Sequence, residues 1–426
     1  MKKRSLSFYI FLAILCGIVN GLAFGEAALP FVQPLSTIFL KLLKMIILPL
    51  IITSILSGVL GIGTAKGLGR LGLRTFSYFL VSSLLAILIG QGLVNCIRPG
   101  EGADLGLTEK ITELEAAEQS LGDLVYRIVP ENPFQALANG DVLPLIFFSI
   151  LFGIFVTRIS NPYKEQLTNL IQGAFEAMMK MTQFVILAAP VGIFAIITRV
   201  VATTGFAAFK ALALYVFVVI SGLILHSLVI LPLLLKSVGR VSPWAHYRRM
   251  TSALLTAFST SSSMGALPFT MENTINNAGV SRKVASFVLP IGATVNMNGT
   301  ALYECVTAIF IAQAYGIELS FGQQAVVVLT ALLAAVGTAG IPMAGMVMTT
   351  IVLQSVGLPL EGIGIVLAVE RILDMCRTTV NIFSDSCGAV IVARLEGEKL
   401  EVKTSTPPHR LFKRGSGEQS SGIQSR

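Results

Sequence analysis

The sequence predicts an all-α membrane protein, and three observations lead to this fold class: an apolar composition, a scarcity of charge and a series of apolar runs. Of the 426 residues, 54% are hydrophobic and 13% are charged. A soluble domain typically has ~25% charged residues, and a soluble globule with so few charges would expose large apolar patches. A soluble enzyme, a nucleic-acid-binding protein and a disordered scaffold are therefore disfavoured.

The net charge of +8 lies almost entirely at the two ends of the chain. Lys2, Lys3 and Arg4 contribute +3, and residues 399–426 contribute +4 from six basic and two acidic residues. Residues 99–132 have the opposite sign, with eight acidic residues against two basic ones. This distribution matches the cytoplasmic bias of basic residues in membrane proteins rather than a nucleic-acid-binding surface. The five cysteines lack CxxC spacing, so neither a disulfide framework nor a zinc site is indicated.

Six apolar runs come first, and each is expected to form a membrane span. A span needs ~20 apolar residues, so the fourth and fifth runs are short. No small-residue cleavage site follows the first run, which we interpret as a retained span. If the amino terminus is cytoplasmic, the connections after the second, fourth and sixth runs are basic and the acidic loop lies outside, as the positive-inside rule requires. The runs cover residues 8–24, 45–62, 76–97, 143–156, 184–197 and 211–235.

After residue 250 the apolar segments are short and are interrupted by Gly, Pro, Asn and Ser. The interruptions are STSSSMGALP at 259–268, GATVNMNGT at 292–300 and GTAGIPMAG at 337–345. Irregular backbone at membrane depth is tolerated only inside the protein or along a wet cavity. Such breaks in separate apolar segments indicate a binding site near the middle of the membrane.

The last span, about 362–395, contains a stripe of polar side chains. At ~100° per residue, five of them fall within ~80° of one another, and charged groups inside a membrane are costly and usually functional. A set of ion pairs that only joins helices is the alternative. The stripe consists of Glu370, Asp374, Arg377, Asn381 and Asp385.

The interrupted segments offer two kinds of ligand group. The serine-rich segment 259–268 places hydroxyls and free N–H groups at a helix start, where carboxylates bind; alternatively, its serines satisfy a helix bend. Asn296, Asn298 and Thr300 flank Gly299, where an opened helix would present carbonyl oxygens to a hard cation.

Residues from about 251 to 398 resemble the dicarboxylate/amino acid:cation symporter family, which includes the glutamate transporters. The similar motifs are the serine-rich segment, NMNGTALYE at 296–304, GTAGIPMAG at 337–345 and LDMCRTTVNIFSD at 373–385. The amino-terminal half is similar more loosely, through its six spans and MIILPLIITSI at 45–55.

The resemblance implies eight transmembrane helices, two re-entrant helical hairpins, a homotrimer in the lipid bilayer and an elevator-type movement. Residues 1–75 would be scaffold helices 1–2, 76–98 transport-domain helix 3, 99–142 the acidic outer loop, and 143–205 scaffold helices 4–5. Residues 206–398 would complete the transport domain with helix 6, hairpin 1 (about 244–276), helix 7, hairpin 2 (about 321–356) and helix 8, and 399–426 would be a disordered cytoplasmic tail.

The resemblance also implies a binding site for an acidic amino acid. Asn381 would hold the α-carboxylate with Ser263, and Asp374 the ammonium group. Arg377 would grip a side-chain carboxylate, for which its planar fork is suited. Neutral exchangers of the family lack this arginine and dicarboxylate carriers lack the acid, so glutamate or aspartate is favoured. The implied substrate-binding set is Ser262, Ser263, Thr300, Ile341, Asp374, Arg377, Thr378 and Asn381.

One or two Na⁺ sites are implied, and a third is degraded. Asn298 replaces the acid on which the third site normally relies, and Phe79 stands where its tyrosine partner is expected, beside Ser82 and Ser83. The first site would use Gly292, Asn296, Asn381 and Asp385, and the second Thr294, Ala335, Val336 and Thr338.

Glu304 resembles the proton-carrying acid of the eukaryotic glutamate transporters. A carboxyl group among apolar neighbours can exchange a proton near neutral pH, so H⁺ is expected to replace the missing Na⁺ in part or in full. A structural acid is the alternative. An additional arginine of the family is absent from this chain, and Arg371 lies ~100° from Glu370 on the helix, which makes it a poor substitute.

The predicted function is therefore import of glutamate or aspartate by symport with Na⁺ and H⁺, without enzymatic activity or a nucleic-acid partner. Its predicted location is a bacterial inner membrane, with both termini in the cytoplasm. The alternatives are a dicarboxylate or neutral amino-acid carrier, a passive anion channel and an intramembrane serine hydrolase. The hydrolase fits badly, because His226, His246 and His409 all lie outside the motifs.

Overall fold

The computed structural model describes residues 6–64, 70–103, 129–204, 207–337 and 344–400. Every regular element in these ranges is a helix, which confirms the predicted all-α class for them. The elements are α1 Leu6–Phe24, η1 Gly25–Ala28, α2 Leu29–Thr64, α3 Arg70–Ile97, α5 Pro133–Asn139, α6 Val142–Val156, α7 Tyr163–Leu187, α8 Ala189–Thr204, α9 Ala207–Leu225, η2 His226–Ile230, α10 Leu231–Ser237, α11 Pro243–Thr260, α12 Ser263–Glu272, η3 Asn273–Asn277, α13 Arg282–Val295, α14 Asn298–Ala314, α15 Phe321–Gly337, α16 Ala344–Ser355, η4 Leu360–Gly362 and α17 Ile363–Leu395.

Among the described residues, three helical stretches are long and apolar enough to cross a membrane. They are Phe8–Leu42, Arg70–Ile97 and Lys210–Ser237, and the pair α7–α8, bent by 49°, makes a fourth if it is one span. The apolar run 184–197 crosses the bend of this pair. The two helices of this pair extend from Tyr163 to Thr204, well beyond the run. The run is shorter than the helices because the first half of α7 contains polar side chains.

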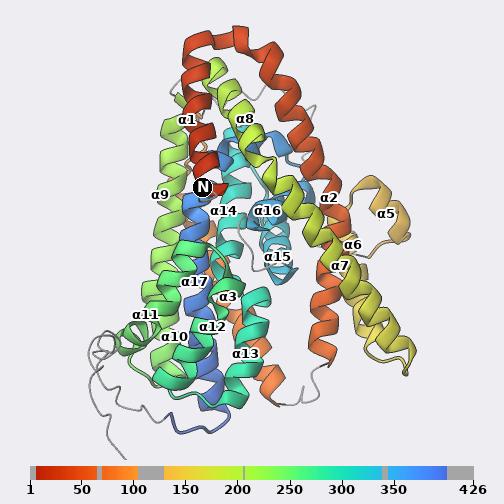
Figure 1. The fold of residues 1–426 in the computed structure, drawn as a ribbon, viewed down its shortest axis with the longest axis vertical. Coiled ribbons are helices and arrows are strands. Elements are labelled where there is room, and N and C mark those ends of the chain that lie inside the picture. The colour runs from red at the N-terminus through yellow and green to blue at the C-terminus, as the bar shows by residue number, and fades with distance from the viewer. Residues whose placement is uncertain (1–5, 65–69, 104–128, 205–206, 338–343, 401–426) are drawn as a thin grey trace, which may run out of the picture.

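One group of helices, called the peripheral group, occupies the top and the right side of the molecule in Figure 1 and consists of α1, α2, α6, α7 and α8. In this group α1 packs along α8, and α2 packs on α6, α7 and α8. Gly21 permits the close approach of α1 to α8, because a Cβ there would lie 2.7 Å from the Cβ of Val201. Small residues at helix contacts are typical of membrane proteins.

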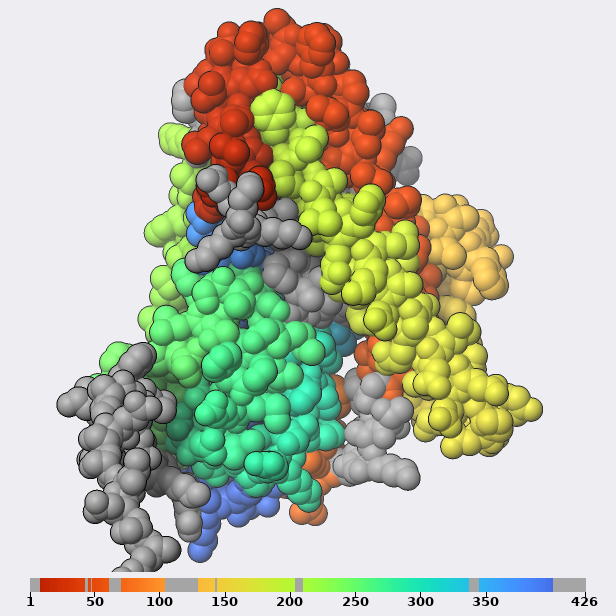
Figure 2. Space-filling view, in the orientation of Figure 1, coloured from red at the N-terminus to blue at the C-terminus, as the bar shows by residue number. Residues whose placement is uncertain are grey.

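The second group surrounds α14, the central helix. Its neighbours include α3, α9, α15, α16 and α17, and residues 298–312 of α14 are buried on every side. A helix that is covered all round belongs to the interior. The first hairpin, α11–α12, packs on α17, and α13 continues into α14; α11, α12 and α13 form one green surface in Figure 2, away from yellow α7.

Two of the three interrupted motifs are breaks between described helices. Ser261 ends α11 with a left-handed φ of 51°, and α12 begins at Ser263. Asn296 and Met297 separate α13 from α14 with ψ of 68° and 62°. Most of the third motif, at 337–345, lies outside the described residues, as do most of the acidic loop and the polar tail.

Candidate functional site

The polar stripe of α17 points into the protein, and Arg377 is at its centre. The guanidinium group is fully buried and lies between two acids. Nη2 is 2.6 Å from Glu370 Oε1 and 2.9 Å from Asp374 Oδ1. Nε is also buried and has no hydrogen-bond partner among the described residues. Arg377 therefore keeps one donor for a further acceptor.

Tyr303 of α14 fixes the other side of this guanidinium. The Arg377 Cζ lies 3.8 Å from the centroid of the Tyr303 ring, a cation–π contact, and the Tyr303 hydroxyl donates to Glu370 Oε2. The guanidinium group also faces α16, where a Cβ on Gly345 would lie 3.3 Å from the Arg377 Cζ. The missing side chain at Gly345 thus lets the second helix pair, α15–α16, approach the arginine closely.

Asp374 lies between two arginines. Its Oδ1 pairs with Arg377, and Arg371 Nη1 is 3.7 Å from Oδ2. The long side chain of Arg371 thus reaches this acid despite the ~100° offset from Glu370 on the helix. That Arg371 is a poor substitute for the additional arginine of the family stays a prediction. Thr378 donates to the Asp374 carbonyl at 2.8 Å.

Asn381 joins α17 to the start of α14. Its Oδ1 accepts from Gly299 N at 2.8 Å, and its Nδ2 donates to Thr300 Oγ1 at 3.2 Å. A Cβ on Gly299 would lie 2.8 Å from the Arg377 carbonyl oxygen, so glycine is needed for this crossing. Asn381, Thr300 and Arg377 are thus neighbours across the crossing.

The first hairpin contributes Ser262 and Ser263. Ser262 is the N-cap of α12, and its Oγ accepts from Gly265 N at 3.0 Å. Its hydroxyl therefore also serves the bend, as the alternative interpretation of the serines held. Ser263 is the first residue of the helix and is buried.

Asn296 and Asp385 meet at the break between α13 and α14. Asn296 Nδ2 donates to Asp385 Oδ1 at 2.8 Å, and both side chains are buried. A Cβ on Gly292 would lie 2.6 Å from Asp385 Oδ1, so the carboxylate lies against bare backbone. A carboxylate beside backbone carbonyls is a set of oxygen ligands suited to a hard cation.

Asn298 lies in a neutral hydrogen-bond network. It accepts from Ser83 Oγ at 2.8 Å, and its Nδ2 is 2.7 Å from Ser384 Oγ and 3.2 Å from His226 Nε2. Ser82 donates to Asn296 at 3.2 Å. These three partners of Asn298 are two hydroxyls and an imidazole.

Phe79 is buried in the apolar packing next to this network. The adjacent Tyr78 points to α17 instead, where its hydroxyl donates to the Ser384 carbonyl at 3.0 Å. The tyrosine of this segment is therefore residue 78, directly before Phe79, and its hydroxyl is bound to α17.

The remaining predicted ligand positions lie along the ends of α13 and α15. Thr294 donates to the Ile291 carbonyl at 3.1 Å. Ala335 is buried, and the Val336 carbonyl faces α2 at Gly58. Thr338 and Ile341 lie outside the described residues.

Glu304 is fully buried on α14, and neither carboxyl oxygen has a hydrogen-bond partner among the described residues. An ionised carboxylate without a partner is very costly in such surroundings. The geometry is that of a carboxyl group that gains from holding a proton.

Comparisons with known proteins identify the relatives of this chain. The model of the sodium:dicarboxylate symporter family matches residues 6–395. The chain belongs to this family. It is 35% identical to a proton/sodium-glutamate symport protein of Geobacillus stearothermophilus, over 95% of this chain and 97% of the relative. It is also 35% identical to the proton/glutamate-aspartate symporter of Escherichia coli, over 92% and 93%, and to mouse excitatory amino acid transporter 3, over 85% and 79%.

In this member of the sodium:dicarboxylate symporter family, sequence reasoning missed several residues that the fold brings to the site. Tyr303 and Ser384 lie within motifs that the sequence singled out, but their types gave no signal of contact with Arg377 or Asn298. His226 was considered only as a catalytic base. The short π-helix η2, in which His226 lies, precedes Pro232, and such turns often mark functional positions.

Proposed function

We propose that the chain is a secondary active symporter that couples the import of glutamate or aspartate to cations. Family membership and relatives named as proton/sodium-glutamate symporters support this function. The observation that supports the substrate best is the buried ion pair between Arg377 and Asp374, at 2.9 Å.

An acidic amino acid can replace both halves of this ion pair. Its side-chain carboxylate would bind the unpartnered Nε edge of Arg377, and its ammonium group would bind Asp374. A dicarboxylate would draw Arg377 away from Asp374 and offer the acid no ammonium group in exchange, which leaves it with Arg371 at 3.7 Å. A neutral amino acid would draw Asp374 away from Arg377 and offer no carboxylate in exchange, which leaves the arginine only Glu370. Since breaking a buried pair by removing one partner costs about 3–5 kcal/mol, the site favours substrates with both groups.

We further propose roles for the neighbouring residues. Asn381 and Ser263 would receive the α-carboxylate, Ile341 would contribute backbone, and Thr300, Thr378 and Ser262 would complete the lining. Na⁺ would bind beside Asp385 with Gly292, Asn296 and Asn381, and a second Na⁺ beside Thr294, Ala335, Val336 and Thr338. The neutral network around Asn298 would hold a third Na⁺ poorly, because an amide replaces the carboxylate.

We propose an elevator mechanism, which the division into two groups of helices supports. The central group, with the hairpins α11–α12 and α15–α16, would move with substrate and cations relative to the peripheral group. Ion binding would bias closure of α15–α16 through its higher affinity for the closed state. We propose a homotrimer in a bacterial inner membrane with cytoplasmic termini, and the domain boundaries given above.

The substrate proposal is tested by uptake of labelled aspartate into proteoliposomes. Arg377→Ala should abolish uptake of aspartate, a loss of at least 100-fold, because it removes the guanidinium that would bind the substrate carboxylate and that pairs with Glu370 and Asp374. Uptake of a labelled neutral amino acid such as serine should persist or rise in this variant. Unchanged aspartate uptake would show that the substrate is assigned wrongly.

The proton proposal concerns Glu304, the buried acid without a partner. An inside-alkaline pH gradient should accelerate aspartate uptake by the wild type, and Glu304→Gln should remove this acceleration while substrate binding persists. The same vesicles without a gradient are the control. Wild-type uptake that is unaffected by the pH gradient would contradict the proton proposal, and Glu304 would then be a structural acid.

A further inference from the structure

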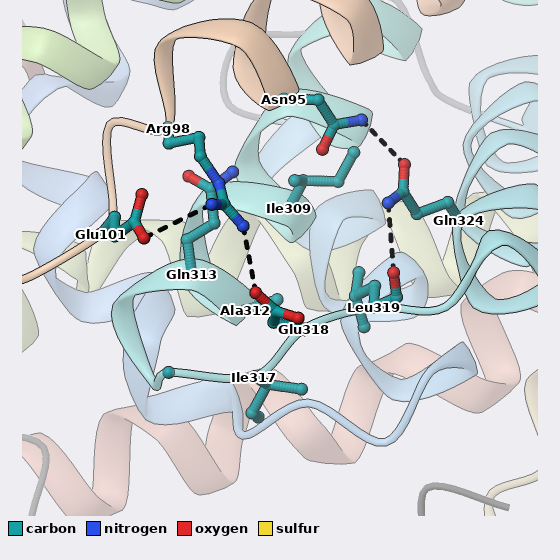
Figure 3. A pocket seen from close by; sticks show the side chains of 11 residues that line it. Asn95, Arg98, Glu101, Ile309, Ala312, Gln313, Ile317, Glu318, Leu319 and Gln324 are labelled. Atoms are coloured by element: carbon teal, nitrogen blue, oxygen red, sulfur yellow. Dashed lines mark hydrogen bonds and ion pairs between the residues drawn. The ribbon is translucent and has the colours of Figure 1, made fainter.

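A cavity lies at the start of the second helix pair, where α3 and α14 end. None of its lining residues belongs to the polar stripe of α17. Its volume is about 230 Å³, and its walls come from the end of α3, the end of α14 and the link that leads into α15. Figure 3 shows Arg98 between Glu101 and Glu318 at this cavity. The lining residues used below are Asn95, Arg98, Glu101, Ile309, Ala312, Gln313, Ile317, Glu318, Leu319 and Gln324.

One wall of the cavity is fixed on α14. Gly100, in the turn after α3, approaches so closely that a Cβ would lie 2.4 Å from the Phe310 carbonyl oxygen. The Gln313 side chain accepts from Gly100 N at 3.2 Å and donates to the Val94 carbonyl at 3.1 Å. Arg98 has a φ of 51°, which is uncommon for a residue with a side chain and is maintained by this tight turn.

The other wall belongs to the start of the second helix pair. Gly316, with a φ of 69°, begins the link from α14 to α15. Gln324, in the first turns of α15, accepts from Asn95 Nδ2 at 2.8 Å and donates to the Leu319 carbonyl at 3.2 Å. Any movement of α15 relative to α3 therefore changes the shape of this cavity.

The charges around the cavity alternate. Arg98 pairs with Glu318 at 3.2 Å and with Glu101 at 3.4 Å, and the Glu318 side chain is 88% exposed. Exposed ion pairs of this kind are weak and easily exchanged. A zwitterion can replace both pairs, with its carboxylate on Arg98 and its ammonium group on the two glutamates. The net charge of −1 for these three residues disfavours an acidic amino acid.

The apolar part of the lining comes from Ile309, Ala312, Ile317 and Leu319. Binding sites for small molecules commonly combine such a lining with a few polar groups that fix orientation. We propose that the cavity binds a small zwitterion with an apolar side chain, such as a neutral branched amino acid, and that its binding holds α15 against α3 and slows transport. The effect on transport rests on the proposed function, whereas the binding does not.

The binding test uses L-leucine as the probe and the full chain, purified in detergent with saturating aspartate and Na⁺. Calorimetry should detect leucine binding, and 4-methylpentanoate and 3-methylbutylamine, which each lack one charge, should bind at least 10-fold more weakly. Arg98→Gln and Glu318→Gln should each weaken leucine binding at least 10-fold. Glu272→Gln, at an exposed glutamate of α12, is the control and should bind leucine like the wild type.

The transport test measures aspartate uptake in proteoliposomes with and without leucine. Leucine should lower the maximal rate several-fold at unchanged KM, and Arg98→Gln should transport at the wild-type rate but ignore leucine. The proposal is wrong if leucine does not bind, if the amine binds as well as leucine, if the variants bind it unchanged, or if leucine raises the KM for aspartate. Absence of aspartate uptake by the wild type would instead contradict the proposed function, and the calorimetry would still decide the site.

Discussion

Asn298 shows how one atom type in a buried network can set ion dependence. Its Nδ2 donates to Ser384 and lies within hydrogen-bond distance of His226. This amide nitrogen stands where a carboxylate would have a second oxygen for a cation. Replacing the amide with a carboxylate converts the donor to an acceptor. Both neighbours can adapt, because a serine hydroxyl rotates and a histidine has two tautomers.

The first prediction is that Asn298→Asp increases the use of Na⁺. Aspartate uptake measured against Na⁺ concentration should become steeper, and half-saturation should fall several-fold, because an anionic oxygen attracts the ion more strongly than an amide oxygen. Asn298→Ala is the matched control, in which the Na⁺ dependence should not steepen. An identical Na⁺ dependence in Asn298→Asp and the wild type would contradict this account of the network.

At the residue scale, the sequence predicted the shared face of the α17 side chains better than their partners on other helices. Helical spacing placed Glu370, Asp374 and Arg377 on one face because i, i+4 and i+7 positions align in any helix. Spacing on one helix does not reveal contacts with another helix, so the place of Tyr303 was missed. The ion pair of Arg371 with Asp374 also depends on side-chain length, which helical spacing does not describe.

At the scale of elements, close helix packing depends on glycines whose need is visible only in three dimensions. Gly90 of α3 faces α14, where a Cβ would lie 2.9 Å from Val306 Cγ2 and 3.0 Å from Leu302 Cγ. Gly92, two residues later, has no such neighbour within 4 Å. The same residue type on one helix thus has two different structural roles.

The second prediction compares these two glycines. Gly90→Leu should destabilise the protein by about 1–3 kcal/mol, the usual cost of forcing extra atoms into a packed interface, and should lower the unfolding temperature in detergent. Gly92→Leu, on the open side of α3, should leave the unfolding temperature unchanged or raise it slightly, since leucine is the better helix former. Equal destabilisation by both substitutions would contradict the packing of α3 on α14.

The positions of the helices were predicted more accurately than their lengths. The runs 8–24 and 45–62 left out the apolar first part of α2, which belongs to the stretch Phe8–Leu42. The polar first half of α7 lowered the hydropathy there, and the helix pair extends to Tyr163. Pro34 and Pro49 lie inside α2 without ending it, because helices in a membrane tolerate proline when neighbours satisfy the freed carbonyls. Breaks at Ser261 and Asn296 were predicted because short polar residues and glycine cluster there.

At the scale of the whole molecule, the peripheral and central groups meet along few elements. These contacts include α2 with α15 and α16, and α8 with α17. Gly364, near the start of α17, is one such contact, and a Cβ there would lie 3.6 Å from Ile196 Cβ of α8. Sequence pattern alone could not predict this pairing, because it depends on how two separate groups dock.

The last prediction uses this pair to test the movement of the two groups. A separation of 3.6 Å between Cβ atoms is within the range that a disulfide requires, so Ile196→Cys with Gly364→Cys should cross-link on oxidation. Because the bond joins the two groups, the oxidised protein should lose aspartate uptake by at least 10-fold and recover it on reduction, while still binding aspartate. The two single-cysteine variants, in a background with Cys16 and Cys96 replaced, should transport under both conditions. If the cross-linked protein transported aspartate as fast as the chemically reduced protein, α8 and α17 would stay together throughout the cycle. The elevator movement would then have to be abandoned.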